Sequence, residues 1–463
     1  MQRSSTRFLA VLAVGALFVG ACGDDKKDTA DTTADTTADT TADTTADTTA
    51  DTSADTTVPA PTSWAVNTDD CIDPDAANAL IEGTIQIGAV FPLTGESAAD
   101  EAFAPVKDGW LAYMDYANEN GLLGDLQIEA SVEDDQYSKD LTPGAVSTLL
   151  DAGVDVFSGI LGTPNNLAVR DTLNEECVPQ LNNLTGAPEW GDVANYPWTT
   201  GERVPYDIEA KVYAEQIAQQ FPEGATVALF SVNSDFGQIY VDAFKELADE
   251  FGLEIVDEQT VEATDGAPPV SQITSIASKA PQVVIGIPIG IGCVTFLNEL
   301  ASAKAQNAGW EPVTYISNTC AASSLILAAA GANADGVLTS NNLLDVKDPA
   351  NADVPAVAEF LAYMDALGKA DTVATAAAGW HVAEVTVAII KQAMESPEGV
   401  TRASIINAAR NFTYTPAFAR PGVVFKSIGE EDPFLAESLQ VVEYDADTAT
   451  FTAIGDVITT FES

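Results

Sequence analysis

The sequence predicts an α/β protein with two doubly wound, Rossmann-like lobes, and three observations lead to this fold class. Strand and helix patterns alternate from Gly83 onward, which indicates parallel sheets covered by helices. Several predicted strands are continuously apolar, as in Val283-Val284-Ile285, and this is typical of parallel strands buried on both faces. About 390 residues follow the N-terminal region, and this length favours two domains over one.

The predicted elements form two series, one for each lobe. Strands are expected where short apolar runs lie between turn residues, and helices where apolar residues recur at helical spacing. The first series alternates strands (Thr84–Phe91, Leu126–Val132, Val154–Ser158 and Val178–Leu181) with helices (Phe103–Asn120, Ala145–Asp151 and Asn165–Glu176). The second series alternates helices (Tyr206–Gln220, Phe236–Phe251, Val270–Lys279 and Val294–Gln306) with strands (Thr226–Phe230, Glu254–Val261, Gln282–Ile287 and Val313–Ile316).

The first 22 residues have the features of a secretory signal. Arg3 and Arg7 form a basic start, and the apolar run from Phe8 to Val19 is shorter than the roughly 20 residues that span a bilayer. Small residues then precede Cys22, an arrangement that resembles the lipobox of bacterial lipoproteins, whose cysteine takes up a diacylglycerol. We expect a signal peptide over residues 1–22 and an exported protein held on the outer face of the cell membrane through Cys22. The alternative is an ordinary signal peptide with a chance cysteine.

Residues 23–70 predict a disordered tether. The motif Asp-Thr-Thr-Ala repeats from Asp31, and such a polar stretch of one charge sign cannot bury enough apolar surface to offset the entropy of ordering. A flexible coil of this length spans roughly 40 Å. A glycosylated threonine stalk with the same mechanical role remains open.

The formal net charge of the chain is −51. The signal region contributes +2 and the tether, with twelve Asp and two Lys, −10, so that −43 falls on residues 71–463. A surface this acidic repels phosphate backbones and anionic bilayers, so nucleic acid is not an expected partner and membrane contact is expected only through the lipid.

Four cysteines remain once Cys22 carries lipid, and an exported protein is expected to pair them. Spacing alone leaves three pairings open. Cys293 and Cys320 follow two neighbouring predicted strands, about 4.8 Å apart, so both emerge at the same edge of the sheet and can form a disulfide. By elimination, Cys71 pairs with Cys177.

The residues give no sign of an enzyme, a metal site or a cofactor. His381 is the only histidine and lies in the helical run Ala376–Met394, which excludes histidine-rich zinc sites. The sequence has no G-x-S-x-G elbow and no D-x-D-x-D-G calcium loop, and Gly286–Gly292 lacks the spacing of a dinucleotide-binding loop.

Short segments, in matching order over most of the chain, carry a family resemblance. They are Gly88–Gly95, Asn118–Gly121, Asp134-Asp135, Gly159–Pro164, Val178–Leu181 and Asp235–Gly237. In these segments the chain resembles the type I periplasmic solute-binding proteins, specifically the branch that serves branched-chain amino acid ABC transporters. The resemblance implies a cleft between the lobes, a small-molecule ligand, ABC permease subunits as partners and a monomer.

The resemblance also implies that the chain crosses between the lobes three times. The expected crossovers lie near Thr200–Arg203, Ser340–Leu344 and Ala417–Gly422. Lobe 1 would then comprise residues 83–201 and 343–417, and lobe 2 residues 202–342 and 418–463.

Ligands of open α/β sheets bind beyond the carboxyl ends of the strands, where Thr163 and Pro164 begin a predicted helix. Backbone N–H groups at a helix start attract a carboxylate, although Thr163 could instead simply cap the helix. The resemblance implies that Thr163 holds the ligand carboxylate and that Thr185 and Gly186 complete the site, where the alternative is a plain turn. It also implies that Phe236 covers the ligand, rather than packing only in the core. The remaining candidates for the pocket are Thr94, Trp110, Trp190 and Asn318.

The sequence departs from the family at one position that bears on the ligand. Amino acid binders of this branch place an acid after the strand that corresponds to Val313–Ile316, whereas Ser317-Asn318-Thr319-Cys320 stands here. A buried ammonium without a counter-charge is costly, so either another acid such as Asp134 or Asp235 replaces it, or the ligand lacks an amine.

We therefore expect capture of a branched-chain amino acid or a related carboxylate-bearing or polar solute for an ABC importer. A tethered sensor that reports ligand state to a receptor, and an enzyme built on the same lobes, remain as alternatives.

Overall fold

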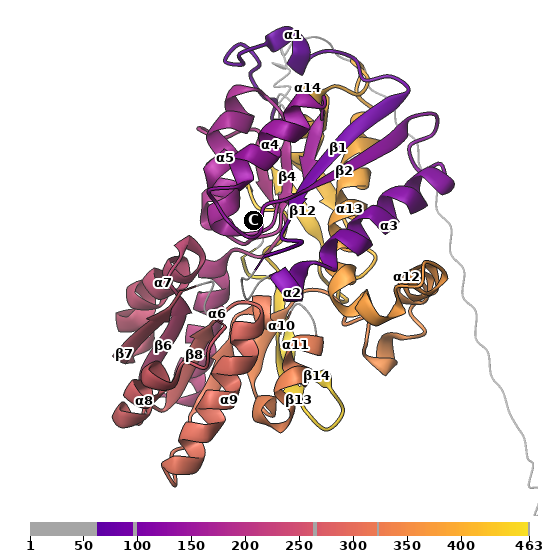
Figure 1. The fold of residues 1–463 in the computed structure, drawn as a ribbon. Helices are drawn as coiled ribbons and strands as arrows, with labels where there is room; N and C mark the ends of the chain where they lie inside the picture. Colours follow the sequence, from indigo (N-terminus) through magenta and orange to yellow (C-terminus); the bar gives the residue numbers. More distant parts are fainter. Residues whose placement is uncertain (1–62, 96–99, 263–265, 322–323, 462–463) are drawn as a thin grey trace, which may run out of the picture. The chain divides into compact units, whose positions relative to one another are not determined.

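The structure is a computed structural model, and it describes residues 63–95, 100–262, 266–321 and 324–461. The expected signal peptide, the lipid-attachment residue Cys22 and most of the expected tether lie outside these residues. Two sheets with covering helices form the described part of the chain (Figure 1), and both belong to one compact unit, Pro61–Ser463. The α/β fold class is thus confirmed.

The first sheet has five parallel strands in the order β2-β1-β3-β4-β5. They are β1 (Thr84–Phe91), β2 (Gln127–Asp134), β3 (Val156–Ser158), β4 (Gln180–Asn183) and β5 (Thr199–Gly201). The helices of this lobe are α1 (Pro74–Ala77), α2 (Asp100–Phe103), α3 (Val106–Glu119), α4 (Thr142–Asp151), α5 (Thr163–Glu175), α12 (Pro355–Ala366), α13 (Val373–Ala393) and α14 (Arg402–Ala409). We call this sheet and these helices lobe 1.

The second sheet has seven strands in the order β14-β13-β10-β9-β8-β6-β7. They are β6 (Ala225–Val232), β7 (Leu253–Val261), β8 (Val283–Ile287), β9 (Val313–Ile316), β10 (Leu338–Asn341), β13 (Leu439–Asp445) and β14 (Thr450–Ile458). The first five are parallel to one another. β13 pairs antiparallel with β10, and β14 pairs antiparallel with β13. With α6 (Tyr206–Gln220), α7 (Asp235–Phe251), α8 (Val270–Lys279), α9 (Ile291–Gln306), α10 (Asn318–Ala321) and α11 (Ser324–Ala330), this sheet forms lobe 2.

Two glycines let α3 and α13 pack closely inside lobe 1. A Cβ atom added at Gly109 would lie 1.8 Å from the carbonyl oxygen of Ala376, and one added at Gly379 would lie 1.9 Å from that of Val106. Any side chain at these positions would therefore push the helices apart. Among the described residues, the region around α13 is the one helical segment with the length and hydropathy of a membrane span, but 83% of its most apolar window is buried in the fold.

The chain passes between the sheets after β5 and after β10, close to the first two expected crossovers. The third expectation, near Ala417–Gly422, is wrong. There β11 (Asn411–Tyr414) and β12 (Phe425–Ile428) pair with each other in a separate hairpin, and β11 packs on α13 and α14. Because this hairpin stays with lobe 1, the chain re-enters the second sheet only at Leu439.

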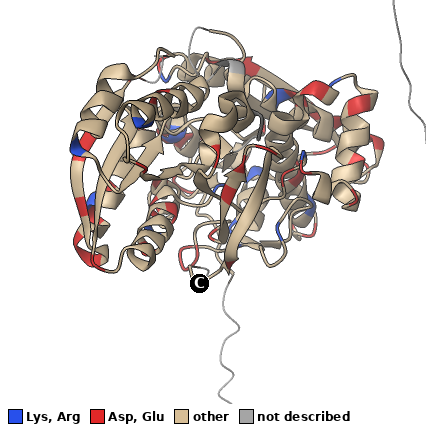
Figure 2. Ribbon diagram, turned by 90° about the horizontal axis from the view of Figure 1, so that it is seen from below, with Lys and Arg blue, Asp and Glu red and all other residues tan. Residues whose placement is uncertain are grey.

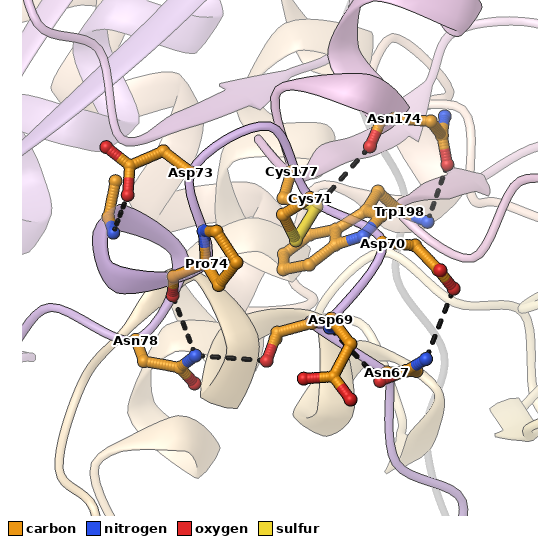
Figure 3. The surroundings of a disulfide bond; sticks show 12 residues. Asn67, Asp69, Asp70, Cys71, Asp73, Pro74, Asn78, Asn174, Cys177 and Trp198 are labelled. Carbon is orange, nitrogen blue, oxygen red and sulfur yellow. Dashed lines mark hydrogen bonds between the residues drawn. A yellow bond between two sulfur atoms is a disulfide. The ribbon is translucent and has the colours of Figure 1, made fainter.

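The segment that precedes the first sheet is bound to lobe 1. The Trp64 N–H donates to the side chain of Asn411 (3.1 Å), and the Val66 N–H donates to that of Asn407 (2.7 Å). Cys71 forms a disulfide with Cys177 (Figure 3). The expectation that the tether stays disordered as far as Asp70 is therefore wrong for its last residues, because side chains far away in sequence satisfy their backbone groups.

Both expected disulfides are confirmed. The Cα atoms of Cys71 and Cys177 lie 5.5 Å apart, and those of Cys293 and Cys320 lie 5.8 Å apart. Cys293 belongs to α9 and Cys320 to α10, which follow the neighbouring strands β8 and β9. The strand-edge argument made from the sequence therefore holds in the structure.

Acidic residues far outnumber basic ones in this protein. Figure 2 shows acidic positions on the elements of both sheets and only scattered basic ones, in line with 70 acidic and 19 basic residues in the chain.

Candidate ligand-binding site

A pocket lies at the carboxyl ends of strands from both sheets. Lobe 1 contributes residues that follow β1 to β4, together with two from α13, and lobe 2 contributes residues that follow β6, β8 and β9. The wall consists of Phe103, Val106, Tyr137, Leu161, Gly162, Thr163, Leu184, Arg203, Tyr206, Phe236, Ile289, Thr319, Ile326, Thr375 and Ala378. This is the place where open α/β sheets bind ligands.

Three hydroxyl groups form a chain at the pocket, with Thr163 and Thr185 from lobe 1 and Tyr206 from the start of α6 in lobe 2. The hydroxyl oxygens of Thr163 and Thr185 lie 2.5 Å apart, and the Tyr206 hydroxyl donates to that of Thr185 (3.3 Å). Thr163 is the first residue of α5, and Gly162, with φ +100°, is the residue that precedes the helix. The Thr163 side chain therefore points to Thr185 and does not cap the helix.

The buried carboxylate of Asp135 stabilises the lobe 1 wall through hydrogen bonds to residues that line it or lie next to it. Asp135 accepts hydrogen bonds from the Tyr137 N–H (3.0 Å), the Thr142 hydroxyl (2.8 Å) and the Asn165 amide (2.8 Å). Burial raises the pKa of Asp135, and these bonds offset only part of the rise. Asp135 thereby fixes the backbone of Tyr137 and the first turn of α5, both of which contribute to the pocket.

Aromatic rings form the lobe 2 wall. The rings of Tyr206 and Phe236 meet edge to face with their centroids 5.1 Å apart, and Tyr240 stacks on Tyr206 at 4.8 Å. Such pairs stabilise by about 0.5–1.5 kcal/mol beyond their burial. Phe236 is placed by Ser234, whose hydroxyl caps α7 by accepting from the Gly237 N–H.

A second buried carboxylate supports the lobe 2 wall. Glu209 accepts from the hydroxyls of Tyr213 (2.6 Å), Ser340 (2.5 Å) and Tyr240, and from the Asn318 N–H (3.1 Å). Burial raises the pKa of Glu209, and its hydrogen bonds oppose this rise without cancelling it. The bond to Asn318 holds the start of α10, whose next residue, Thr319, lines the pocket.

Of the site residues expected from the sequence, Thr163 and Phe236 line the pocket. Pro164 and Asn318 are each next to a lining residue. Thr185 contacts the pocket through its bond to Thr163, and Gly186 lies behind it. A Cβ atom on Gly186 would come within 2.2 Å of the Val204 carbonyl oxygen.

The structure does not bring the other three expected residues to the pocket. Thr94 is exposed and bonds to Asp134. Trp110 is buried in the core of lobe 1, where its indole N–H donates to the Ser158 hydroxyl (3.2 Å). Trp190 donates to the Thr185 carbonyl (3.0 Å) and so supports the site without lining it.

Sequence reasoning missed several wall residues, notably Tyr137, Arg203, Tyr206 and Thr319. Tyr137 lies two residues after the Asp134-Asp135 pair, and Arg203 and Tyr206 lie where the chain first crosses between the lobes. The position of Arg203 in the expected crossover was the one signal that could have suggested it.

Arg203 lies beside a buried contact between a carboxylate and an imidazole. Glu202 and His381 are almost fully buried, and the Glu202 Oε1 and His381 Nε2 atoms lie 2.8 Å apart. Burial alone would raise the pKa of Glu202, but the hydrogen bond and charge of His381, together with the charge of Arg203, lower it. A second cavity shares Arg203 and Ala378 with the pocket, so the two cavities adjoin at this arginine.

A family model described as "periplasmic binding protein" matches residues 84–449, which is most of the chain. The chain belongs to the periplasmic binding protein family. A comparison with curated proteins gives no match.

Solved structures of type I periplasmic binding proteins share the fold. A branched-chain amino acid ABC transporter protein from Thermus thermophilus, with bound valine, has a TM-score of 0.71 and 21% identity, covering 81% of this chain and 96% of that one. A fatty acid ABC transporter substrate-binding protein from Thermomonospora curvata has a TM-score of 0.66 and 18% identity, covering 82% and 93%. An R. palustris solute-binding protein in complex with benzoate has a TM-score of 0.64 and 17% identity, covering 81% and 96%.

Membership of this family implies an exported protein that binds a small molecule and works with the permease of an ABC transporter. Within the described residues, no three His, Cys, Asp or Glu side chains gather as a metal site requires.

Proposed function

We propose that this periplasmic binding protein is the substrate-binding component of an ABC importer, and that it captures a small carboxylate-bearing or polar solute when its two lobes close. The observation that carries the proposal is the pocket, whose wall comes from the strand ends of both sheets. A ligand held by both walls is bound better when they approach each other, and this difference in affinity drives closure.

The chemistry of the wall supports a carboxylate. Thr163 and Arg203 both line the wall, and hydroxyl and guanidinium groups donate to carboxylate oxygens, whereas the Tyr206 hydroxyl proton already goes to Thr185. The ligands named for the Thermus thermophilus and R. palustris proteins, valine and benzoate, share a carboxylate, although their other groups differ.

Ligand-dependent thermal stabilisation across a panel of amino acids, amides and small carboxylates tests the proposal, with Thr163→Val and Thr163→Ser as the paired variants. Valine has the shape of threonine without the hydroxyl, so Thr163→Val should weaken binding of the best ligand by roughly ten- to a hundredfold, while Thr163→Ser should retain most of it. Loss of uptake in a strain without the protein would distinguish transport from sensing. A panel without any stabilising ligand, or unchanged binding by Thr163→Val, would count against this site.

We further propose that the mature protein is a monomer anchored by lipid at Cys22, which becomes its first residue after removal of residues 1–21. Support comes from the basic start, the short apolar run and the small residues before Cys22. The N-terminal peptide of protein from a lipoprotein-processing host should carry a diacylglycerol on Cys22 when its mass is measured. An unmodified cysteine in that peptide would contradict the lipid anchor.

A further inference from the structure

The described pocket wall has one ionic side chain, and it is a cation. Arg203 lies between β5 and α6, and its side chain is partly accessible, with 22% of its surface exposed. Its carboxylate neighbour is already engaged, because Glu202 lies 2.8 Å from His381 and only its second oxygen, at 3.8 Å, faces the Arg203 Nε atom. A separation of 3.8 Å is too long for a hydrogen bond. Within the described part of the chain, the two terminal nitrogens of Arg203 make no hydrogen bond.

Arg203 lines the pocket together with Thr163 and Tyr206, two members of the hydroxyl chain. Tyr206, three residues further along, donates to Thr185, which in turn bonds to Thr163. Burial raises the pKa of Tyr206, and the positive charge of Arg203 opposes that rise, which agrees with a guanidinium close to the phenol. The pocket wall therefore combines hydroxyl groups with the guanidinium of Arg203, whose terminal N–H groups can donate to a ligand.

No acid of the described wall can pair with a ligand ammonium. Asp134, one candidate from the sequence, is outside the wall and accepts hydrogen bonds from the N–H groups of Leu93 (2.8 Å) and Gln136 (3.0 Å). Asp235, the other candidate, is also outside the wall. Glu209 is fully buried behind the tyrosines, and both of its oxygens already accept hydrogen bonds.

Apolar groups make up most of the remaining wall, among them Phe103, Leu161, Phe236, Ile289 and Ile326. These side chains favour a ligand with an apolar body. Transfer of an ammonium group into such surroundings without a counter-charge is strongly unfavourable.

We propose that the pocket selects carboxylates that carry an aromatic or aliphatic body and no ammonium group, and that Arg203 is the residue that pairs with the ligand carboxylate. A guanidinium offers two parallel N–H donors to a carboxylate, a geometry that lysine cannot reproduce. The Glu202–His381 pair positions Arg203 by holding the neighbouring carboxylate away from its terminal nitrogens. This inference rests on the proposed function and specifies its ligand class.

Matched ligands that differ in one group test the selectivity. Isothermal titration of the full chain compares 3-phenylpropanoate with phenylalanine and 4-methylpentanoate with leucine, with 3-phenylpropanamide as the uncharged analogue. The amine-free acids should bind at least about a hundredfold more tightly than the amino acids, and the amide should bind at least about tenfold more weakly than its acid. Equal affinity for leucine and 4-methylpentanoate overturns the inference and leaves the proposed function intact, whereas a panel in which nothing binds overturns both.

Variants of Arg203 test the residue itself. Arg203→Met should weaken binding of the better acid by at least about tenfold, and Arg203→Lys should lose less because it keeps the charge. Lys245→Met is the control, since it removes an exposed cation, paired with Glu258, from the outside of lobe 2 and should change nothing. Thermal unfolding without ligand shows that each variant is folded. Wild-type affinity in Arg203→Met overturns the assignment.

Discussion

The two walls of the pocket are each held by a buried carboxylate, but the two carboxylates are assembled differently. Asp135 in lobe 1 accepts from partners 2, 7 and 30 residues away in sequence. Glu209 in lobe 2 accepts from partners 4, 31, 109 and 131 residues away. The lobe 1 wall is therefore built mainly by local turns, whereas the lobe 2 wall depends on distant segments meeting at one side chain.

The difference bears on how the lobes can move. Glu209 lies one turn into α6, directly after the first crossover, and its partner Ser340 lies in β10, directly before the second. Glu209 therefore joins the lobe 2 ends of two crossovers to the pocket wall through Asn318 and Tyr240. The hydrogen-bond partners described above for Asp135 all belong to lobe 1, so Asp135 shapes a wall without joining it to a crossover.

The largest expected difference between the two carboxylates is in the stability lost when each is replaced by alanine. Glu209→Ala leaves the hydroxyls of Tyr240 and Ser340 and one N–H without their acceptor, while Tyr213 keeps the Ile316 carbonyl, and should lower the free energy of unfolding by about 3–5 kcal/mol. Asp135→Ala removes an acceptor from three donors and should cost about 2–3 kcal/mol. Chemical denaturation with ligand absent measures both values.

The conservative variants Glu209→Gln and Asp135→Asn serve as controls, because each keeps the shape and one acceptor oxygen. Each should cost less than the matching alanine variant. If Asp135→Ala proved more destabilising than Glu209→Ala, the long-range assembly in lobe 2 would not be the more important of the two.

The sequence was most informative where a local pattern determines an element. β1, β9, α6 and α8 have the predicted bounds, because their apolar runs or helical spacing end at clear turn residues. The hairpin of β11 and β12 and the antiparallel pair β13 and β14 were not predicted. Their pairing depends on where the chain returns after leaving lobe 1, and nothing local to those strands specifies that return.

The same distinction applies to the site. Thr163 could be predicted because it begins the helix after β3, at the edge where open sheets bind ligands, and because the family resemblance singled out this position. Arg203 could not, because its role depends on Glu202 being engaged by His381, 179 positions later in the printed sequence. Trp110 and Thr94 were expected in the pocket from position alone. Instead, Trp110 is buried and bonds to the Ser158 hydroxyl, and Thr94 bonds to Asp134.

The pH dependence of stability provides the finest comparison, because the pKa values of the adjacent carboxylates Asp134 and Asp135 are shifted in opposite directions. Burial raises the pKa of Asp135 and of Glu209, so each contributes stability that is present below about pH 4 and is lost as pH rises through the folded-state pKa. Burial also acts on Asp134, but hydrogen bonds from Thr94, Leu93 and Gln136 outweigh it and lower its pKa, so its contribution is present above about pH 4 and is lost as pH falls.

Unfolding free energies between pH 3 and pH 8 should therefore show opposite trends for the variants at these positions (the range brackets the ordinary carboxyl pKa values of about 4). The difference between the wild-type protein and Glu209→Gln, or Asp135→Asn, should decrease as pH rises. The difference between the wild-type protein and Asp134→Asn should increase over the same range, by a smaller amount because Asp134 is partly exposed to solvent. Parallel trends at Asp134 and Asp135 would mean that burial, rather than hydrogen bonding, dominates both, and the contrast between the walls would then rest on Glu209 alone.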